Sequence, residues 1–169
     1  MNQREVEMLY DEYAEGIHRF LLSLVRHPDD ARDLLQDIFV RVARSEGFLE
    51  SKTNVRAFLF KMARNAAIDR SRRLATRRRR DDSIKDETSP FAPTADPDAE
   101  VFRNEVAQAL TRLPEVQREV VYLKLWENLS FQEIAEVCST PLATASSRYR
   151  YGIEKLRNQL DPIYREINE

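Results

Sequence analysis

Hydrophobic residues recur along the chain at spacings of three and four, which is typical of amphipathic helices. The first repeat covers residues 6–25 and ends at a His-Pro pair, because a residue before proline is disfavoured in a helix. A second repeat covers residues 31–42, and Asp29 or Asp30 is expected to cap its helix. A third begins at Val55 and continues into a run of arginines. The first half of the chain therefore predicts three helices.

The second half is also helical in its pattern. Periodic segments at residues 101–110 and 116–126 predict two helices, and a Leu-Pro pair ends the first. Ser130 and Glu133 have the spacing of a capping box, which starts a helix. A Thr-Pro pair at residues 140–141 predicts another start, with threonine as the cap and proline at the first helical position. A short helix, a sharp turn and a longer helix make a helix-turn-helix pattern.

Residues 81–98 separate the two halves and have a different composition. They read DDSIKDETSPFAPTADPD, with three prolines and few large apolar residues. Such a segment is expected to be an extended linker. We therefore predict an all-α fold of two small helical domains, residues 1–80 and residues 99–169, joined by an acidic flexible linker.

The distribution of charge changes the picture that the net charge suggests. The chain has 169 residues and a formal net charge of −2, which argues weakly against nucleic acid as a partner. However, residues 71–80 hold six basic and no acidic side chains, and residues 81–100 hold one basic and seven acidic ones. A concentrated basic block can hold phosphates even when the whole chain is slightly acidic.

Nothing in the sequence indicates enzymatic chemistry. His18, His27 and Cys138 are too few and too scattered for a metal site, and Cys138 is expected to serve in packing. No nucleophile elbow, phosphate loop or carboxylate pair is present. A single cysteine excludes an internal disulfide, and neither an apolar membrane span nor a signal peptide is seen. We predict a cytoplasmic protein without enzymatic activity, cofactor or membrane insertion.

The helix after the turn carries the first candidate binding residues. Its small hydroxyl, arginine and tyrosine side chains suit a helix in the major groove, where arginine reaches phosphates or guanine. These residues are Thr144, Ser146, Ser147, Arg148, Arg150 and Tyr151. The spacing alone favours this interpretation no more than an ordinary helical hairpin.

The basic block is the second candidate. It follows a helix that carries Lys61, Arg64 and Arg70, so helix and block together form a positive stripe. Nucleic-acid contact is the favoured interpretation, and a solvated charge run is the alternative. Residues 32–42, RDLLQDIFVRV, are explained on their own as an amphipathic core helix.

Taken together, these segments resemble the extracytoplasmic-function (group IV) sigma factors of the sigma-70 family, the promoter-recognition subunits of bacterial RNA polymerase. Residues 29–42, DDARDLLQDIFVRV, resemble region 2.2. Residues 54–73, NVRAFLFKMARNAAIDRSRR, resemble regions 2.3 and 2.4, with the family's Asn-x-x-x-Asp pair at Asn65 and Asp69. Residues 113–157 resemble region 4. The likeness covers nearly the whole chain.

The resemblance implies a division of roles. The first domain would recognise and open the minus-ten element, and the second would bind the minus-thirty-five element. The implied minus-ten residues are Phe48, Phe58, Lys61, Arg64, Asn65, Asp69, Arg72 and Arg73. The implied polymerase-binding residues are Asp33, Leu34, Gln36, Asp37, Phe39 and Arg41. The implied partners are promoter DNA, the β′ coiled coil and β flap of core polymerase, and an anti-sigma factor.

Four positions in the helix-turn-helix depart from the family's common pattern. Ser139 and Ala143 stand where glycine is usual, Ala145 where valine is usual, and Ser146 where a basic residue is frequent. Without that basic side chain, recognition is expected to rest on the two later arginines and Tyr151.

Two other functions remain open from the sequence. A stand-alone helix-turn-helix regulator accounts for the second domain but leaves the first domain and the linker without a role. A sigma mimic, which titrates an anti-sigma factor without binding DNA, has no need of the arginines in the basic block or of Arg148 and Arg150.

Overall fold

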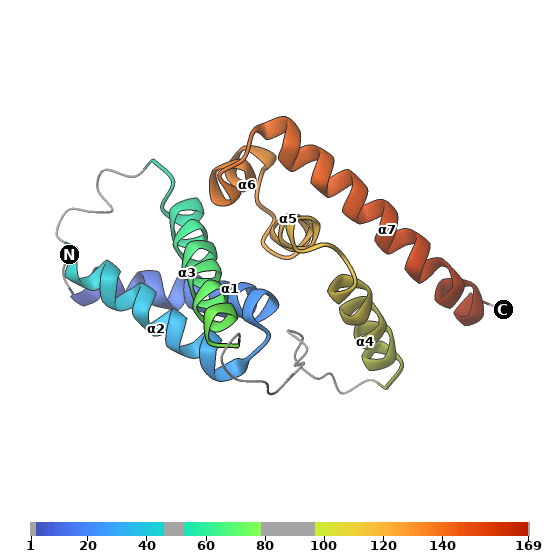
Figure 1. The fold of residues 1–169 in the computed structure, drawn as a ribbon, viewed down its shortest axis with the longest axis horizontal. Helices are drawn as coiled ribbons and strands as arrows, with labels where there is room; N and C mark the ends of the chain where they lie inside the picture. Colours follow the sequence, from blue (N-terminus) through green and yellow to red (C-terminus); the bar gives the residue numbers. More distant parts are fainter. Residues whose placement is uncertain (1–2, 46–52, 79–96, 169) are drawn as a thin grey trace. The chain divides into compact units, whose positions relative to one another are not determined.

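The computed structural model describes residues 3–45, 53–78 and 97–168. All regular structure within these residues is helical, which confirms the predicted all-α class. The chain divides into two compact units, the first Met1–Thr88 and the second Ser89–Glu169. The helices, labelled in Figure 1, are α1 Gln3–Val25, α2 Pro28–Arg44, α3 Val55–Arg78, α4 Pro97–Thr111, α5 Glu115–Leu125, α6 Phe131–Cys138 and α7 Leu142–Asn168.

The first unit is a three-helix cluster. A short connection joins α1 to α2, and α3 packs against both. Each helix contributes apolar side chains to one core, in which the rings of Phe20 and Phe60 lie 5.6 Å apart between centroids. Ile17, Ile38 and Leu59 are also buried there. This core fixes the surface that α3 presents.

The connection between α1 and α2 differs from the prediction. The helix α2 begins at Pro28 with His27 at the N-cap, so Asp29 and Asp30 lie in its first turn and neither caps it. Proline fits this position because the first helical residues have no intrahelical partner for their N–H groups. Arg26 adopts a positive φ of 57°, which reverses the chain directly after α1.

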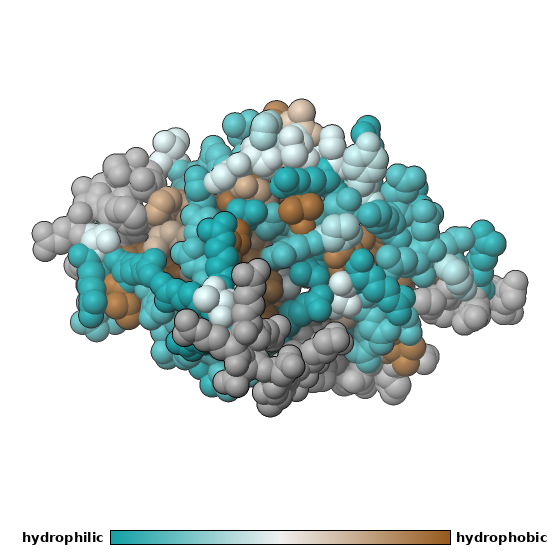
Figure 2. Space-filling model, in the orientation of Figure 1, coloured by the Kyte–Doolittle hydropathy of each residue, from teal (hydrophilic) through white to brown (hydrophobic). Residues whose placement is uncertain are grey.

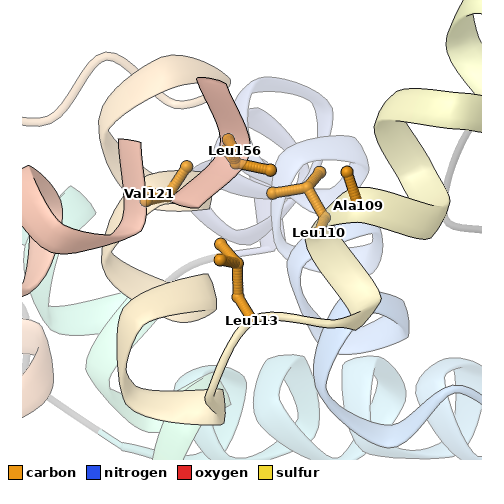
Figure 3. Packing of buried hydrophobic residues seen from close by; sticks show 5 residues of the cluster. All are labelled: Ala109, Leu110, Leu113, Val121 and Leu156. Carbon is orange, nitrogen blue, oxygen red and sulfur yellow. The ribbon is translucent and has the colours of Figure 1, made fainter. Parts of the chain in front are cut away.

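The second unit is arranged around the long helix α7. The helices α4, α5 and α6 each pack against α7. Its buried cluster joins α4, α5 and α7 with a residue of the connection between α4 and α5 (Figure 3); the members are Ala109, Leu110, Leu113, Val121 and Leu156. The predicted helix end at Leu113 is confirmed, since α4 stops at Thr111 and α5 begins at Glu115.

The predicted linker falls almost entirely outside the described residues, as does the basic block after Arg78. Of the predicted linker, only residues 97 and 98 are described, and they form the start of α4. The face drawn in Figure 2 is mainly hydrophilic, with hydrophobic residues in small separate patches. Among the described residues, no helix is both long and apolar enough to cross a membrane.

Candidate nucleic-acid interface

The helix-turn-helix is formed by α6, a tight corner and α7. Ser130 and Glu133 form the predicted capping box: the Ser130 N–H donates to the Glu133 carboxylate at 2.7 Å, and the Glu133 N–H donates to the Ser130 hydroxyl at 3.2 Å. Two N–H groups that an isolated helix end leaves without partners are thereby satisfied. The start of α6 is therefore fixed by its own sequence.

The corner itself is a Schellman-type helix end. Ser139 is left-handed, with φ 51° and ψ 48°, and its N–H donates to the Glu136 carbonyl at 3.3 Å. The Thr140 N–H donates to the Ala135 carbonyl at 3.0 Å, which closes the motif. Glycine is the usual residue at such a position because other residues meet a steric cost there. The chain accepts this cost to turn sharply from α6 into α7.

The start of α7 is one residue later than predicted. The Pro141 carbonyl accepts from the N–H groups of Thr144 and Ala145, each at 3.0 Å, and the helix begins at Leu142. Pro141 therefore stands at the N-cap rather than at the first helical position. The Thr-Pro pair therefore predicts the place of the helix-turn-helix correctly, but it predicts the first residue of the second helix one position too early.

The six predicted residues of α7 lie on its accessible part. Ser146, Arg150 and Tyr151 are exposed, and the others are half-buried. The Ser147 hydroxyl donates to the Ala143 carbonyl at 2.9 Å, so it presents its oxygen as an acceptor. The Arg150 guanidinium lies 5.2 Å from the centre of the Tyr151 ring, a cation–π distance. This contact limits the freedom of an arginine that would otherwise be flexible.

The opposite side of α7 is anchored in the core, and one anchor is a glycine that sequence analysis did not single out. Ala145 and Leu156 are buried on this side. Gly152 lies between them, and a Cβ atom added there would stand 2.6 Å from the Val121 side chain. Only glycine allows α5 and α7 to approach so closely. A glycine within an otherwise strong helical pattern was the available signal.

The second candidate surface is the long helix α3. Phe58, Lys61, Asn65, Asp69 and Arg72 recur at steps of three and four residues and therefore share one side of the helix. Three of them are exposed, and Phe58 and Lys61 are half-buried.

Two more predicted residues flank this side: Arg64, which is half-buried, and Arg73, which is exposed. The buried side of α3 is formed by Ala57, Leu59, Phe60, Ala63 and Ala67. Phe48, the remaining predicted residue, lies outside the described residues.

Polar contacts hold α3 at both ends of its packed part. The Asn54 side chain accepts from the Ala57 N–H at 2.9 Å and so caps the helix. Further along, the Arg70 guanidinium donates to the Asp30 carboxylate at the start of α2. The sequence pattern places Arg70 in the positive stripe and gives no sign of this ion pair, whose members are 40 residues apart.

The predicted polymerase-binding residues of α2 fall into two groups. Asp33, Gln36, Asp37 and Arg41 are exposed. Leu34 and Phe39 are buried, with 7% and 6% of their surface exposed.

The Phe39 ring packs edge-on against Tyr10 at 4.9 Å between centroids. Leu34 and Phe39 therefore hold α2 in place, and only the four polar side chains form an accessible face. We define these four as the α2 polar face. In the part of the chain that the structure describes, no cluster of His, Cys, Asp and Glu could hold a metal ion.

The chain thus combines two helical units, one with a helix-turn-helix and one with a basic helix. The comparisons with known proteins specify the class. Sigma-70 region 2 matches residues 9–78, and Sigma-70, region 4 matches residues 103–156. The chain belongs to the sigma-70 family and, within it, to the ECF sigma factors.

Relatives match over nearly the full length. RNA polymerase sigma factor CarQ of Myxococcus xanthus is 33% identical, covering 98% of this chain and 94% of that protein. ECF RNA polymerase sigma factor SigX of Bacillus subtilis is 25% identical, covering 95% of this chain and 86% of that protein. Both similarities extend across the two units.

Solved structures share the fold. The sigma factor RpoE of Bartonella quintana, in complex with the anti-sigma factor NepR, matches with a TM-score of 0.80 and 22% identity, covering 94% of this chain and 98% of that one. The structure of CnrH in complex with the cytosolic domain of CnrY gives a TM-score of 0.69 and 23% identity, covering 95% and 90%. At these identities the likeness concerns the fold alone.

Proposed function

We propose that this protein directs core RNA polymerase to one class of promoters, binding the minus-thirty-five element through α7 and the minus-ten element through α3. The observation that carries the proposal is the presence of both sigma-70 regions in one chain, in order, each in its own compact unit. A stand-alone regulator would need only the second unit. The protein itself performs no chemistry; it lends promoter specificity to the polymerase.

In the second unit, the N-terminal half of α7 enters the major groove. The capping box, the Ser139 corner and the Gly152 contact fix the direction of this helix, and the polar side is left free for DNA. Arg148 and Arg150, which are half-buried and exposed, supply positive charge at the two edges of this side, because residues two apart do not share a helix face. Arginine donates two hydrogen bonds to the guanine edge or to phosphate oxygens. This side can therefore both orient the protein on the DNA and recognise the base sequence.

In the first unit, α3 contacts separated or separating strands. Lys61, Arg64, Arg72 and Arg73 bind the backbone, and Asn65 and Asp69 provide hydrogen-bonding groups between them. The half-buried ring of Phe58 offers a surface on which an unpaired base stacks. Stacking offsets part of the free energy that unpairing a base requires, which is a few kcal/mol.

Two protein partners complete the proposal. The α2 polar face, which has both acidic and basic groups, binds core polymerase. The two solved relatives are named as complexes with an anti-sigma factor and with the cytosolic domain of a second protein, which supports the same kind of regulation for this chain. An anti-sigma factor would keep the protein inactive by covering these surfaces.

The deciding experiment is run-off transcription with purified core polymerase on fragments of the source genome, followed by mapping of start sites. We expect transcripts that begin downstream of one shared pair of sequence elements. The double variant R148A/R150A should lose these transcripts and still bind core polymerase in a pull-down. A protein that fails to bind core polymerase contradicts the proposal, and unchanged transcription by the double variant contradicts the role of α7.

A further inference from the structure

The leading end of α7 is uncharged and opens with two apolar residues, and this feature is not explained by the two arginines. The helix begins LATASS, and its first charged residue is Arg148. Leu142 is 48% exposed, similar to Leu125 at 50% and Tyr151 at 49% in the same unit, and it is the one at the start of α7. Ala143 beside it is exposed as well. Two apolar side chains therefore face solvent at the first turn of the proposed recognition helix.

The position of Leu142 relates it to the residues that are proposed to contact bases. Leu142, Ser146 and Arg150 follow one another at steps of four, so they lie along one side of α7. A recognition helix contacts base edges mainly through its N-terminal residues. Leu142 is thus the member of this row that reaches furthest into the groove.

Only one group in the major groove is apolar, the C5 methyl of thymine, and apolar side chains contact it. We propose that Leu142 contacts a thymine methyl in the minus-thirty-five element and thereby makes this protein prefer an A·T pair there. The inference rests on the proposed function and specifies the base chemistry that α7 selects. Arg150, about two turns further along the helix, contacts a guanine or a phosphate.

Replacement of single thymines by deoxyuridine provides the test, because uracil pairs as thymine does and lacks only the methyl group. The template is the promoter mapped by run-off transcription, with each thymine of its minus-thirty-five element replaced in turn on either strand. The protein is the full chain bound to core polymerase, and the initiation rate is measured at limiting enzyme. With the natural chain, deoxyuridine at one or two adjacent positions should lower the rate about four-fold, the effect of removing one buried methyl group.

Three variants assign the effect to Leu142. L142Q keeps the length of the side chain and removes its apolar character, so it should initiate equally on thymine and deoxyuridine templates. L142M keeps the apolar contact and should retain the four-fold ratio. R150A should lower the rate on both templates and leave their ratio unchanged. Because Leu142 is about half exposed, these variants are expected to fold, and thermal unfolding followed by circular dichroism checks this.

The inference is overturned if the natural chain gives a ratio of one at every thymine. It is also overturned if L142Q keeps the ratio of the natural chain, since the methyl is then sensed by another group. A mapped minus-thirty-five element without any A·T pair has the same consequence. A lack of initiation on all templates would instead contradict the proposed function, and the inference with it.

Discussion

The helices α3 and α7 carry the two proposed DNA surfaces, and the protein fixes them in different ways. In addition to its buried core residues, α3 is held by polar groups at the two ends of its packed part, the Asn54 cap and the Asp30–Arg70 ion pair. Backbone geometry and close packing hold α7: the left-handed Ser139 and the approach at Gly152. The side chains differ as well, since α3 presents charges along much of its length and α7 begins with small or apolar residues. The charges of α3 suit contacts with the phosphate backbones of DNA strands, and the small side chains at the start of α7 suit insertion into the major groove.

The largest expected effect concerns the packing of α7. In G152A, the new methyl group collides with Val121, and the free energy of unfolding of the second unit should fall by about 2 kcal/mol, as for an overpacked core. Its melting temperature should fall by roughly 10 °C while that of the first unit stays unchanged, as calorimetry can measure.

A second substitution tests the cause of this effect. V121A removes the colliding methyl groups and should restore part of the stability in the double variant, although V121A alone destabilises the protein. If G152A is as stable as the natural chain, α5 and α7 do not approach as closely as the structure indicates.

The next effect separates the two kinds of DNA contact. R72A on α3 and R150A on α7 should each reduce promoter binding by the holoenzyme about ten-fold, the loss of one good charged contact. R72A should weaken all promoters equally and lower the slope of log affinity against log salt by about one. R150A should instead change the preference among minus-thirty-five sequences.

Binding to a set of promoter variants at several salt concentrations measures both effects. R165A is the matched control, because Arg165 is exposed near the end of α7 and pairs with Asp161 at 2.8 Å. It should change neither the slope nor the preference. The distinction between the two helices is lost if R72A and R150A give the same pattern.

Local signals in the sequence were sufficient for much of this fold. The capping box at Ser130 and the Leu113-Pro114 stop involve residues close in sequence, and both are present as predicted. At Asp29 and Asp30, however, two local signals competed, and the proline at the first helical position prevailed over an aspartate cap. The helix-capping preferences of single residues do not decide which of two neighbouring start signals a helix uses.

The features that were missed depend on tertiary contact. No pattern connects Asp30 to Arg70 across 40 positions, because only the packing of α2 against α3 brings them together. Gly152 is notable only once Val121 is known to lie against it. Similarly, Leu34 and Phe39 matched the family's polymerase-binding segment by position, and only burial shows that they face the core.

A smaller effect is expected for the polar anchor of α3. The side chains of Asp30 and Arg70 are 18% and 36% exposed, so solvent screens their attraction in part. D30A and R70A should each lower the free energy of unfolding of the first unit by about 1 kcal/mol or less, as measured in urea. The double variant should cost little more than either single one, because both remove the same interaction.

Additive losses in that cycle would show that the two side chains act separately. High salt offers an independent check, since it should narrow the difference between D30A and the natural chain. The pair ties α3 to α2 two residues before Arg72 and Arg73. D30A is therefore expected to lower the transcription rate slightly more than the loss of folded protein alone would. S139G, in the second unit, is the comparison and should leave the transcription rate unchanged.

The smallest effect, and the only stabilising one, concerns the corner before α7. Ser139 has φ 51°, a conformation in which a side chain costs about 1 kcal/mol and glycine costs little. S139G should therefore raise the free energy of unfolding of the second unit by about 0.5 kcal/mol, since glycine also gains entropy in the unfolded chain. Its melting temperature should rise by roughly 3 °C. S139A is the control, because alanine keeps the steric cost and should bring no gain. Equal gains from both variants would mean that Ser139 is not left-handed in solution, and the corner that directs α7 would then need another explanation.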